Sequence, residues 1–431
     1  MAPALTPLRS VEAGDALVEY RDQGPATEPP RDHLISVEKA LARAVALARP
    51  ISETELVPLA EASGRVLAEG ARALGPLPSF DSAAMDGYAV RRVELIGAGP
   101  WQLPVVGRVA AGGLAPEAFS GAIRILTGAP VPAGFDAVVM QERVRRDGGV
   151  IRLDTIPPAG DNIRRAGEDL AAGAPILSAG ALIGVRETAA LAAAGIARPH
   201  VRRRVRIATL VTGDELLPAG DALGPGHIWD ANGPMLAAAV VQPWIERRDF
   251  GRVHDDPITL TKALSEAASW ADLVVTSGGV SVGDADHMGR ALARTGGEVV
   301  VKQVAMKPGK PILIGRIGRS VHIGLPGTPL SAFVGWTLFG APCVAALAGR
   351  PPCRRDIFVR AGFTFERRPG RCEFRPARRV GTDETGAQIV EPITERFTHS
   401  LAALAAADGL VILPADAKQI LEGDLLRFLP L

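Results

Sequence analysis

A short apolar strand that runs directly into a glycine-rich turn, within residues 272–287, restricts the possible folds of this chain most strongly. The turn contains serines, glycines and, at its end, two carboxylates: Ser277, Gly278, Gly279, Ser281, Gly283, Asp284 and Asp286. Glycines permit positive φ and let backbone N–H groups approach an anion, and serine hydroxyls add hydrogen-bond donors. Because two carboxylates would repel a bare phosphate, the segment predicts a phosphate site that also holds a divalent cation. A tight strand-to-helix turn without a ligand is the alternative.

Three other segments have the same character. Residues 205–215 form an apolar strand that ends in Gly-Asp-Glu, residues 253–257 read Val-His-Asp-Asp-Pro, and residues 321–331 lead from a strand into a Gly/Pro turn. Helical stretches at 259–270 and 287–295 alternate with these strands, which predicts βαβ units in a parallel sheet. The polar turns then share the edge where such sheets bind ligands. Any single Asp is also compatible with a helix N-cap, but four such turns together favour a site.

The lysines cluster in one segment. The chain has six lysines among its 48 Lys and Arg residues, and Lys302, Lys307 and Lys310 lie within nine residues of one another. A compact, mobile ammonium serves where a planar guanidinium would not. The cluster therefore indicates an oxyanion site, and a solvated loop between strands is the alternative.

Seven motifs resemble those of the molybdopterin molybdenumtransferase family, the MoeA type that is related to the gephyrin E domain. They occur in family order within residues 34–431: PSFDSAAMDGYA at 78–89, ILTGAPVP at 125–132, NIRRAGED at 162–169, TGDE at 212–215, SGGVSVGDAD at 277–286, KPGKP at 307–311 and LPGTPLS at 325–331. The chain departs from the family at Ser82-Ala83, where Asn-Ser is usual, at Thr328, where Asn is usual, and at His254, where Arg is usual. None of these departures removes a carboxylate or a lysine.

The resemblance implies an α/β multidomain fold. Its parts are a parallel-sheet α/β molybdopterin-binding domain, a β-rich inserted domain, a discontinuous linker domain and a C-terminal small β-barrel. Changes in periodicity and Gly/Pro content suggest where these parts begin and end. We expect a flexible N-terminal extension at 1–33, a discontinuous first domain at 34–75 and 171–204, the inserted domain at 76–170, the α/β domain at 205–350 and the barrel at 351–431.

The resemblance also implies a reaction. The family inserts molybdate into adenylyl-molybdopterin, with Mg²⁺-dependent release of AMP, in molybdenum cofactor biosynthesis. By resemblance, the residues fall into three groups: Asp214, Asp255 and Asp286 for Mg²⁺; Ser277, Gly278, Gly279 and Ser281 for phosphate; and Lys307, Lys310, Ser331 and Arg371 for molybdate. Glu215 is a candidate catalytic residue that would position or activate a water, and the alternative is an acid in the first turn of a helix.

The β-rich insertion carries further candidates, which the family would place at the active site of the partner subunit. They are Asp81, Thr127 and Asp169 as catalytic residues and Arg164 as a substrate-binding residue. Arg165 adjoins Arg164, and the sequence does not rank the two. Thr398 and Ser400 both lie near the family's hydroxyl position at the end of the barrel.

Composition, charge and cysteine content limit the classes of protein and partner that fit this chain. With 431 residues, 47% of them hydrophobic and 22% charged, the chain is typical of a globular protein of two to four domains, and its net charge of +1 gives no reason to expect nucleic acid or an anionic membrane as a partner. The three cysteines suit neither a disulfide scaffold nor a zinc or iron–sulfur site, and the start of the chain lacks a signal-peptide pattern. We expect a cytoplasmic homodimer, with molybdopterin adenylyltransferase and molybdoenzyme-specific chaperones as candidate partners.

Residues 323–349 contain no charge, and the stretch is long enough to span a bilayer. Gly335, Gly340 and Pro342 interrupt it, and it directly follows a strand and a turn. We interpret it as a buried helix of the α/β domain.

Two other functions fit parts of the sequence. The upstream adenylyltransferase shares the Ser-Gly-Gly-Val motif, but its domain usually stands alone and is not accompanied by Lys-Pro-Gly-Lys. A scaffold that binds a protein partner, as gephyrin does, would not need the intact carboxylates and lysines. Molybdate-dependent release of AMP would distinguish the transferase from both.

Overall fold

The computed structural model describes residues 34–114, 116–117, 120–280, 287–351, 356–393 and 400–431. The chain divides into two units, residues 1–34 and residues 35–431, and every feature below belongs to the second unit. The extension expected at 1–33 lies outside the described residues.

The α/β region, residues 205–350, is built on one mixed sheet with the strand order β16–β13–β17–β21–β20–β18. The first four strands of this order run parallel, as predicted, whereas β20 pairs antiparallel with both β21 and β18. The parallel alignment of β13, β17 and β21 brings their carboxyl ends to one edge. The strands are β13 (Val205–Thr212), β16 (Ile245–Val253), β17 (Leu273–Ser277), β18 (Glu298–Gln303), β20 (Pro311–Ile317) and β21 (Ser320–Leu325).

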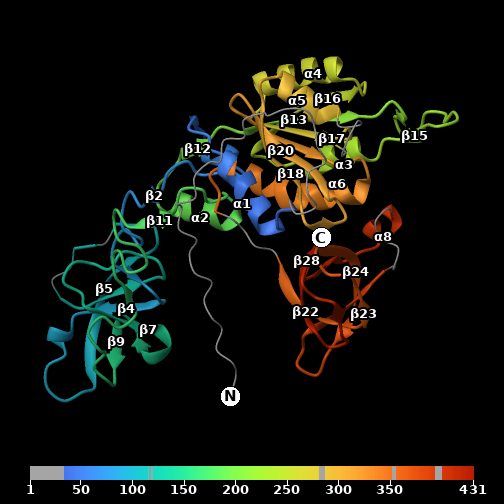
Figure 1. Cartoon of the computed structure of the whole chain (residues 1–431). Coiled ribbons are helices and arrows are strands. Elements are labelled where there is room, and N and C mark those ends of the chain that lie inside the picture. The colour runs from blue at the N-terminus through green and yellow to red at the C-terminus, as the bar shows by residue number, and fades with distance from the viewer. Residues whose placement is uncertain (1–33, 115, 118–119, 281–286, 352–355, 394–399) are drawn as a thin grey trace. The chain divides into compact units, whose positions relative to one another are not determined.

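Helices cover both faces of this sheet (Figure 1). Apolar residues of α4 and α5 pack on one face, and those of α1, α3 and α6 pack on the other. Helix α4 begins at Pro257 because Asp256 caps it, with its carboxylate accepting from the N–H groups of Ile258 and Thr259 at 3.0 Å each. The helices are α1 (Val37–Leu47), α3 (Asn232–Ala239), α4 (Pro257–Trp270), α5 (His287–Arg294) and α6 (Pro329–Gly335).

The uncharged stretch forms a continuous helical segment at Pro329–Leu347. It consists of α6, a π-helical turn η4 (Trp336–Gly340) and α7 (Ala341–Leu347). Its length and apolar character would suffice to cross a bilayer, but most of its residues are buried inside the protein. Val334, Phe339 and Val344 lie in the same core as the strands of the sheet, so the prediction of a buried helix is confirmed.

The inserted region, residues 76–170, contains a sheet with the strand order β7–β4–β6–β5–β9–β8 and a separate pair, β3 and β10. Two apolar clusters support it: one includes Ile123, Ile125 and Val138, and the other includes Tyr88 and Ile151. The strands are β3 (Ser82–Ala83), β4 (Gly87–Val90), β5 (Trp101–Val109), β6 (Ala122–Ile125), β7 (Ala137–Met140), β8 (Arg145–Asp147), β9 (Val150–Leu153) and β10 (Ile163–Arg164).

Two stretches that are far apart in the sequence form the linker region. Strand β1 pairs with β12, strand β2 pairs with β11, and Leu67, Ile183, Leu191 and Val201 share one small core. The elements are β1 (Thr54–Leu56), η1 (Leu59–Glu61), β2 (Ala71–Arg72), β11 (Pro175–Leu177), α2 (Val185–Ala193) and β12 (His200–Arg202).

The C-terminal region closes into a barrel. Among the described residues, five strands form a ring in the order β24–β25–β22–β28–β26, which returns to β24. The short strand β19 joins this sheet by pairing with β24, so a segment of the α/β region lies beside the barrel. The elements are β19 (Met306–Lys307), β22 (Ile357–Ala361), β23 (Phe365–Glu366), β24 (Cys372–Thr382), β25 (Gln388–Pro392), α8 (Leu401–Ala405), β26 (Gly409–Leu413), β27 (Gln419–Ile420) and β28 (Leu425–Pro430).

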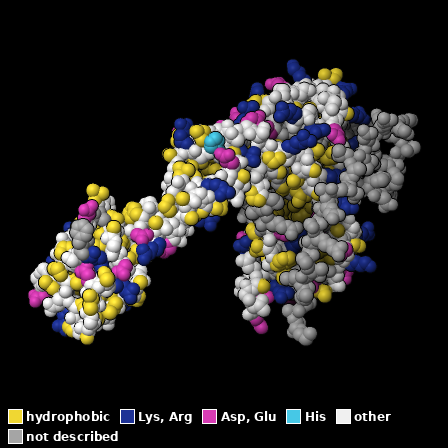
Figure 2. All heavy atoms as spheres, turned by 90° about the vertical axis from the view of Figure 1, so that its left-hand side faces the viewer, with side chains coloured by type: hydrophobic (Ala, Val, Ile, Leu, Met, Phe, Trp, Pro, Cys, Tyr) yellow, Lys and Arg dark blue, Asp and Glu magenta, His cyan; other side chains and the backbone are white. Residues whose placement is uncertain are grey.

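Charges of both signs are mixed on one face of the protein. On the face drawn in Figure 2, basic and acidic side chains are interspersed and no large field of one sign is visible. This distribution agrees with the net charge of +1.

Candidate active site

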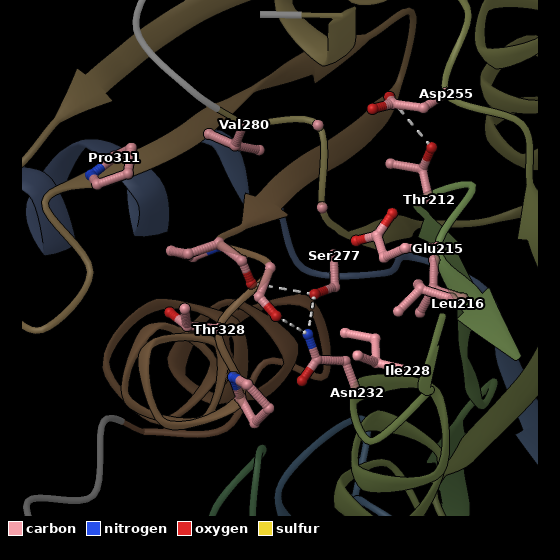
Figure 3. A pocket seen from close by; sticks show the side chains of 17 residues that line it. Thr212, Glu215, Leu216, Ile228, Asn232, Asp255, Ser277, Val280, Pro311 and Thr328 are labelled. Carbon is pink, nitrogen blue, oxygen red and sulfur yellow. Dashed lines mark hydrogen bonds between the residues drawn. The ribbon is translucent and has the colours of Figure 1, made fainter. Parts of the chain in front are cut away.

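The carboxyl ends of β13, β17 and β21 surround a cavity of about 500 Å³ (Figure 3). The structure therefore brings together polar turns that are separated by more than a hundred residues in the sequence. The lining residues are Val211, Thr212, Gly213, Glu215, Leu216, Ile228, Asn232, Asp255, Ser277, Gly278, Gly279, Val280, Pro311, Pro326, Gly327, Thr328 and Pro329.

Gly278 and Gly279 line this cavity where neighbouring chain segments approach closely. Both have positive φ, +95° and +64° respectively. A Cβ at Gly278 would stand 2.1 Å from the carbonyl oxygen of Thr212, and a Cβ at Gly279 would stand 3.3 Å from Oδ1 of Asp255. The predicted glycine cradle is therefore a close approach of three chain segments that only glycine at 278 permits.

Asn232, at the start of α3, joins two of these segments. Its buried amide donates from Nδ2 to Oγ of Ser277 at 2.8 Å and to the carbonyl oxygen of Gly327 at 2.7 Å (Figure 3). Ser277 Oγ in turn donates to the carbonyl oxygen of Pro326 at 3.1 Å. These bonds fix the end of β17 against the turn that follows β21, and they hold the Ser277 hydroxyl in place.

The acidic groups follow β13 and β16. Asp214 Oδ1 lies 3.0 Å from Nδ1 of His254 and accepts from the N–H of Asp255 at 3.4 Å. These two hydrogen bonds, that of His254 first, lower the pKa of Asp214 below 3.8. Asp255 Oδ1 accepts from the Thr212 hydroxyl at 3.3 Å, and Glu215 folds back over Gly213 at the rim of the cavity.

The donor chemistry of this corner fits a hard divalent cation such as Mg²⁺. Asp214 and Asp255 supply carboxylate oxygens, and the Gly213 carbonyl is an additional oxygen donor. Across the described parts of the chain, no three His, Cys, Asp or Glu side chains gather closely enough to bind a metal. The third predicted ligand, Asp286, lies outside the described residues, as does the predicted phosphate ligand Ser281.

The predicted oxyanion residues lie in two groups. Ser331 is buried in the first turn of α6, and its Oγ accepts from the Thr328 hydroxyl at 2.7 Å, which links it to the cavity lining. The Lys-Pro-Gly-Lys segment packs against it, since a Cβ at Gly309 would stand 3.5 Å from the Ser331 carbonyl oxygen. Neither Lys307 nor Lys310 lines the cavity itself, although Pro311 does.

The second group lies where β19 pairs with β24. Lys307 stands opposite Glu373 in this pairing, and the N–H of Cys372 donates to the carbonyl oxygen of Ala305 at 2.8 Å. Arg371 directly precedes the paired residues and is exposed. The pairing thus brings the predicted ligands Lys307 and Arg371 to one place. Ser400 caps α8 by accepting from the N–H of Ala403 at 3.1 Å, whereas Thr398 lies outside the described residues.

Comparison with known proteins identifies this arrangement. Residues 35–195 match the MoeA N-terminal region (domain I and II), residues 208–346 match a probable molybdopterin binding domain, and residues 359–431 match the MoeA C-terminal region (domain IV). The chain belongs to the MoeA family. The resemblance seen in the seven sequence motifs is therefore confirmed.

Relatives of the MoeA family match nearly the whole chain. It is 34% identical to the molybdopterin molybdenumtransferase of Haemophilus influenzae, over 88% of this chain and 94% of that protein. It is 37% identical to molybdopterin molybdenumtransferase 2 of Mycobacterium tuberculosis, over 90% of this chain and 97% of that protein. The crystal structure of the molybdopterin biosynthesis MoeA protein from Pyrococcus horikoshii aligns with a TM-score of 0.78 at 30% identity, covering 92% of this chain and 99% of that chain.

The candidates in the inserted region make local contacts. Asp81 accepts from Nη1 of Arg165 at 2.5 Å and from the N–H of Ala166 at 2.8 Å. Both hydrogen bonds lower the pKa of Asp81 below 3.8, and that from the N–H of Ala166 has the larger effect. Thr127 donates from both its N–H and its hydroxyl to Asp86 Oδ1, each at 2.7 Å. The side chain of the neighbouring Arg164 is exposed at the end of β10, and Asp169 is exposed in the loop that follows.

Sequence reasoning gave no individual role to three residues that the structure connects to this site. Asn232 precedes no recognisable motif, and Thr212 belongs to the TGDE motif at 212–215 but received no role of its own. Glu373 stands in the segment Arg-Cys-Glu-Phe-Arg, whose alternation of charged and apolar residues is typical of a strand with one solvated face. A buried polar residue beside a glycine turn has no signature in a single sequence, so only the contacts in the structure reveal these roles.

Proposed function

We propose that this protein is a molybdopterin molybdenumtransferase, which inserts molybdate into adenylyl-molybdopterin and releases AMP in molybdenum cofactor biosynthesis. The observation that carries the proposal is the cavity at the carboxyl ends of β13, β17 and β21, which combines a glycine cradle with two carboxylates. The identity to the two named transferases over most of the chain supports the same reaction.

The residues of the cavity have distinct roles in this proposal. The backbone of Gly278 and Gly279 approaches the phosphate of the substrate, and the Ser277 hydroxyl, held by Asn232, keeps the cradle in register. Lys307, Lys310, Ser331 and Arg371 surround the tetrahedral oxyanion, because ammonium, hydroxyl and guanidinium groups all donate hydrogen bonds to it. Glu215 at the rim orients the water that cleaves the phosphoanhydride.

Asp214 and Asp255 hold Mg²⁺ in this proposal, together with Asp286. The bound ion would neutralise phosphate oxygens and polarise the bond that breaks. A deprotonated carboxylate is needed for this, and the hydrogen bonds to Asp214 lower its pKa and so favour that form.

The active unit in this proposal is a cytoplasmic homodimer with composite sites. Asp81, Thr127, Arg164 and Asp169 of one subunit would serve the α/β site of the other. A molybdopterin adenylyltransferase would supply the substrate, and molybdoenzyme-specific chaperones would receive the product. Co-folding of two inactive variants, Asp169→Asn and Asp255→Asn, tests this arrangement, because one site of each heterodimer carries neither change. We expect roughly a quarter of wild-type activity from random pairing. Activity at the level of the single variants, despite proven subunit exchange, would place the site within one chain.

The deciding experiment incubates the purified protein with adenylyl-molybdopterin, Mg²⁺ and molybdate and measures AMP. We expect release of AMP that depends on molybdate, and loss of about two orders of magnitude in Asp255→Asn, since a neutral ligand removes charge stabilisation worth several kcal/mol. A protein that binds adenylyl-molybdopterin without releasing AMP would instead be a scaffold.

A further inference from the structure

A buried carboxylate lies directly beside the predicted oxyanion ligands. Glu373, on β24 of the barrel, is only 5% exposed. Its Oε1 lies 3.7 Å from Nζ of Lys307 and 3.3 Å from Nε of Arg367, and its Oε2 lies 3.0 Å from Arg375. Lys307 is the partly exposed member of this set, with 34% of its side chain accessible, so its ammonium faces both Glu373 and the surroundings.

Arg367 extends the network to Arg371. Its side chain is 1% exposed and donates to the carbonyl oxygens of Pro414, Ala417 and Arg371. The turn between Arg367 and Arg371 is therefore tied to the loop that follows β26. One guanidinium, oriented by Glu373, fixes the main chain at the position from which the Arg371 side chain extends.

Glu373 contacts several cations. Its carboxylate faces the side chains of Lys307, Arg367 and Arg375. Arg375 also stacks over the ring of Phe365, with its guanidinium carbon 3.9 Å from the ring centroid. One buried carboxylate thus holds several cations in fixed places.

We propose that Glu373 is a positioning residue for the oxyanion site, which holds the Lys307 ammonium directly and the Arg371 main chain through Arg367. This inference rests on the proposed function, because it takes Lys307 and Arg371 to be molybdate ligands. It predicts an effect opposite to simple electrostatics. Removal of a negative charge should strengthen anion binding if Glu373 only contributes charge, and should weaken it if Glu373 orients the ligands.

The test compares the wild type with Glu373→Gln, Lys307→Ala and the double variant. Molybdate binding is measured by calorimetry, and AMP release gives the molybdate concentration for half-maximal rate. We expect each single change to raise the molybdate dissociation constant and the half-maximal molybdate concentration roughly tenfold, as the loss of a supporting contact does at metal sites. In the double variant, the molybdate dissociation constant should rise by less than the product of the two single increases, because Glu373 acts partly through Lys307. Affinity for AMP should stay unchanged.

Two further variants keep the result interpretable. Glu366→Gln neutralises an exposed carboxylate next to Arg367 and should leave molybdate binding unchanged. If Glu373→Gln does not fold, Arg367→Lys keeps the charge but loses the contacts to the three carbonyls, and it should raise the molybdate dissociation constant alone. Unchanged or tighter molybdate binding in Glu373→Gln overturns the inference, and Arg367→Lys serves for the same comparison if Glu373→Gln does not fold. The inference is also overturned if the increase in the double variant equals the product of the increases in Glu373→Gln and Lys307→Ala. Unchanged binding in Lys307→Ala would instead refute the assignment of Lys307 in the proposed function.

Discussion

The sheet edge and the inserted region carry equally clear motifs, yet their polar residues behave differently in the structure. At the sheet edge, Asn232 bonds to Ser277 and Gly327, and Thr212 bonds to Asp255, so residues from distant parts of the sequence meet at one cavity. In the inserted region, the contacts of Asp81 and Thr127 remain within that region: Asp81 with Arg165 and Ala166, and Thr127 with Asp86.

This difference teaches what each motif can do alone. Parallel strands gather polar turns at one edge, so the α/β region has a cavity within a single chain. The turns of the inserted region form hydrogen bonds that would stabilise it without any ligand. In the proposed function the inserted region acts at the site of a second subunit, whereas the cavity at the sheet edge lies within one chain. The predictions below test the two regions separately.

The largest effect is expected from Gly278→Ala. The added Cβ would stand 2.1 Å from the Thr212 carbonyl oxygen at a φ of +95°, so β13 and β17 would have to separate. We expect loss of more than 3 kcal/mol of stability in the α/β region and at least a hundredfold lower AMP release. Thermal unfolding measures the loss of stability, and the AMP assay measures the loss of activity.

The matched control is Gly112→Ala in the inserted region. Gly112 has a φ of +78°, but a Cβ there would meet no atom within 4 Å. Gly112→Ala should lower the free energy of unfolding by about 1 kcal/mol, because only the conformational penalty of a positive φ applies. Equal effects of the two changes would show that the close approach at Gly278 does not matter.

The second prediction concerns the stability of the protein at low pH. His322 on β21 is fully buried, with Nε2 3.2 Å from the Thr276 hydroxyl, and burial lowers its pKa from 6.5 to about 4. Because the unfolded chain binds the proton more readily, this contribution to stability is complete above pH 6.5 and is lost as the pH falls towards 4. We expect wild type to lose about 3 kcal/mol over this range from His322. His322→Gln should lose correspondingly less, as the midpoints of urea unfolding at both pH values would show. A steep acid loss in both proteins would exclude His322 as the cause.

The sequence predicted much of the fold because periodicity and turn chemistry are local signals. Helices α4 (Pro257–Trp270) and α5 (His287–Arg294) lie within two residues of the predicted stretches 259–270 and 287–295, and β13 and β17 end at the predicted turns. The antiparallel edge formed by β18 and β20 was not anticipated, since a strand pattern does not reveal its direction.

The site was predictable only in part. Turn chemistry and the clustering of lysines selected the glycine cradle and the lysines, and motif resemblance assigned ligand roles to them, whereas Asn232 and Glu373 required three-dimensional contacts. Arg165, rather than Arg164, reaches Asp81, because the antiparallel register pairs Arg164 with Ser82 and so brings the next residue, Arg165, opposite Asp81. A single sequence does not contain that register.

The smallest effect on stability is expected from Asp81→Asn, and it separates the two roles of the inserted region. The pair with Arg165 is largely exposed, so its loss should change stability by less than about 1 kcal/mol. The contribution of Asp81 is present above its ordinary pKa of 3.8 and is lost only as the pH falls through the lower value in the folded state, so it cannot explain a loss between pH 6.5 and 4. If Asp81 also serves the partner's site, Asp81→Asn should lower AMP release at least tenfold with unchanged thermal unfolding. Asp154→Asn, which breaks a comparable exposed pair with Arg152 in the same region, should leave AMP release unchanged. Equal activity of both variants would mean that the Asp81 contacts stabilise the turn and do nothing more.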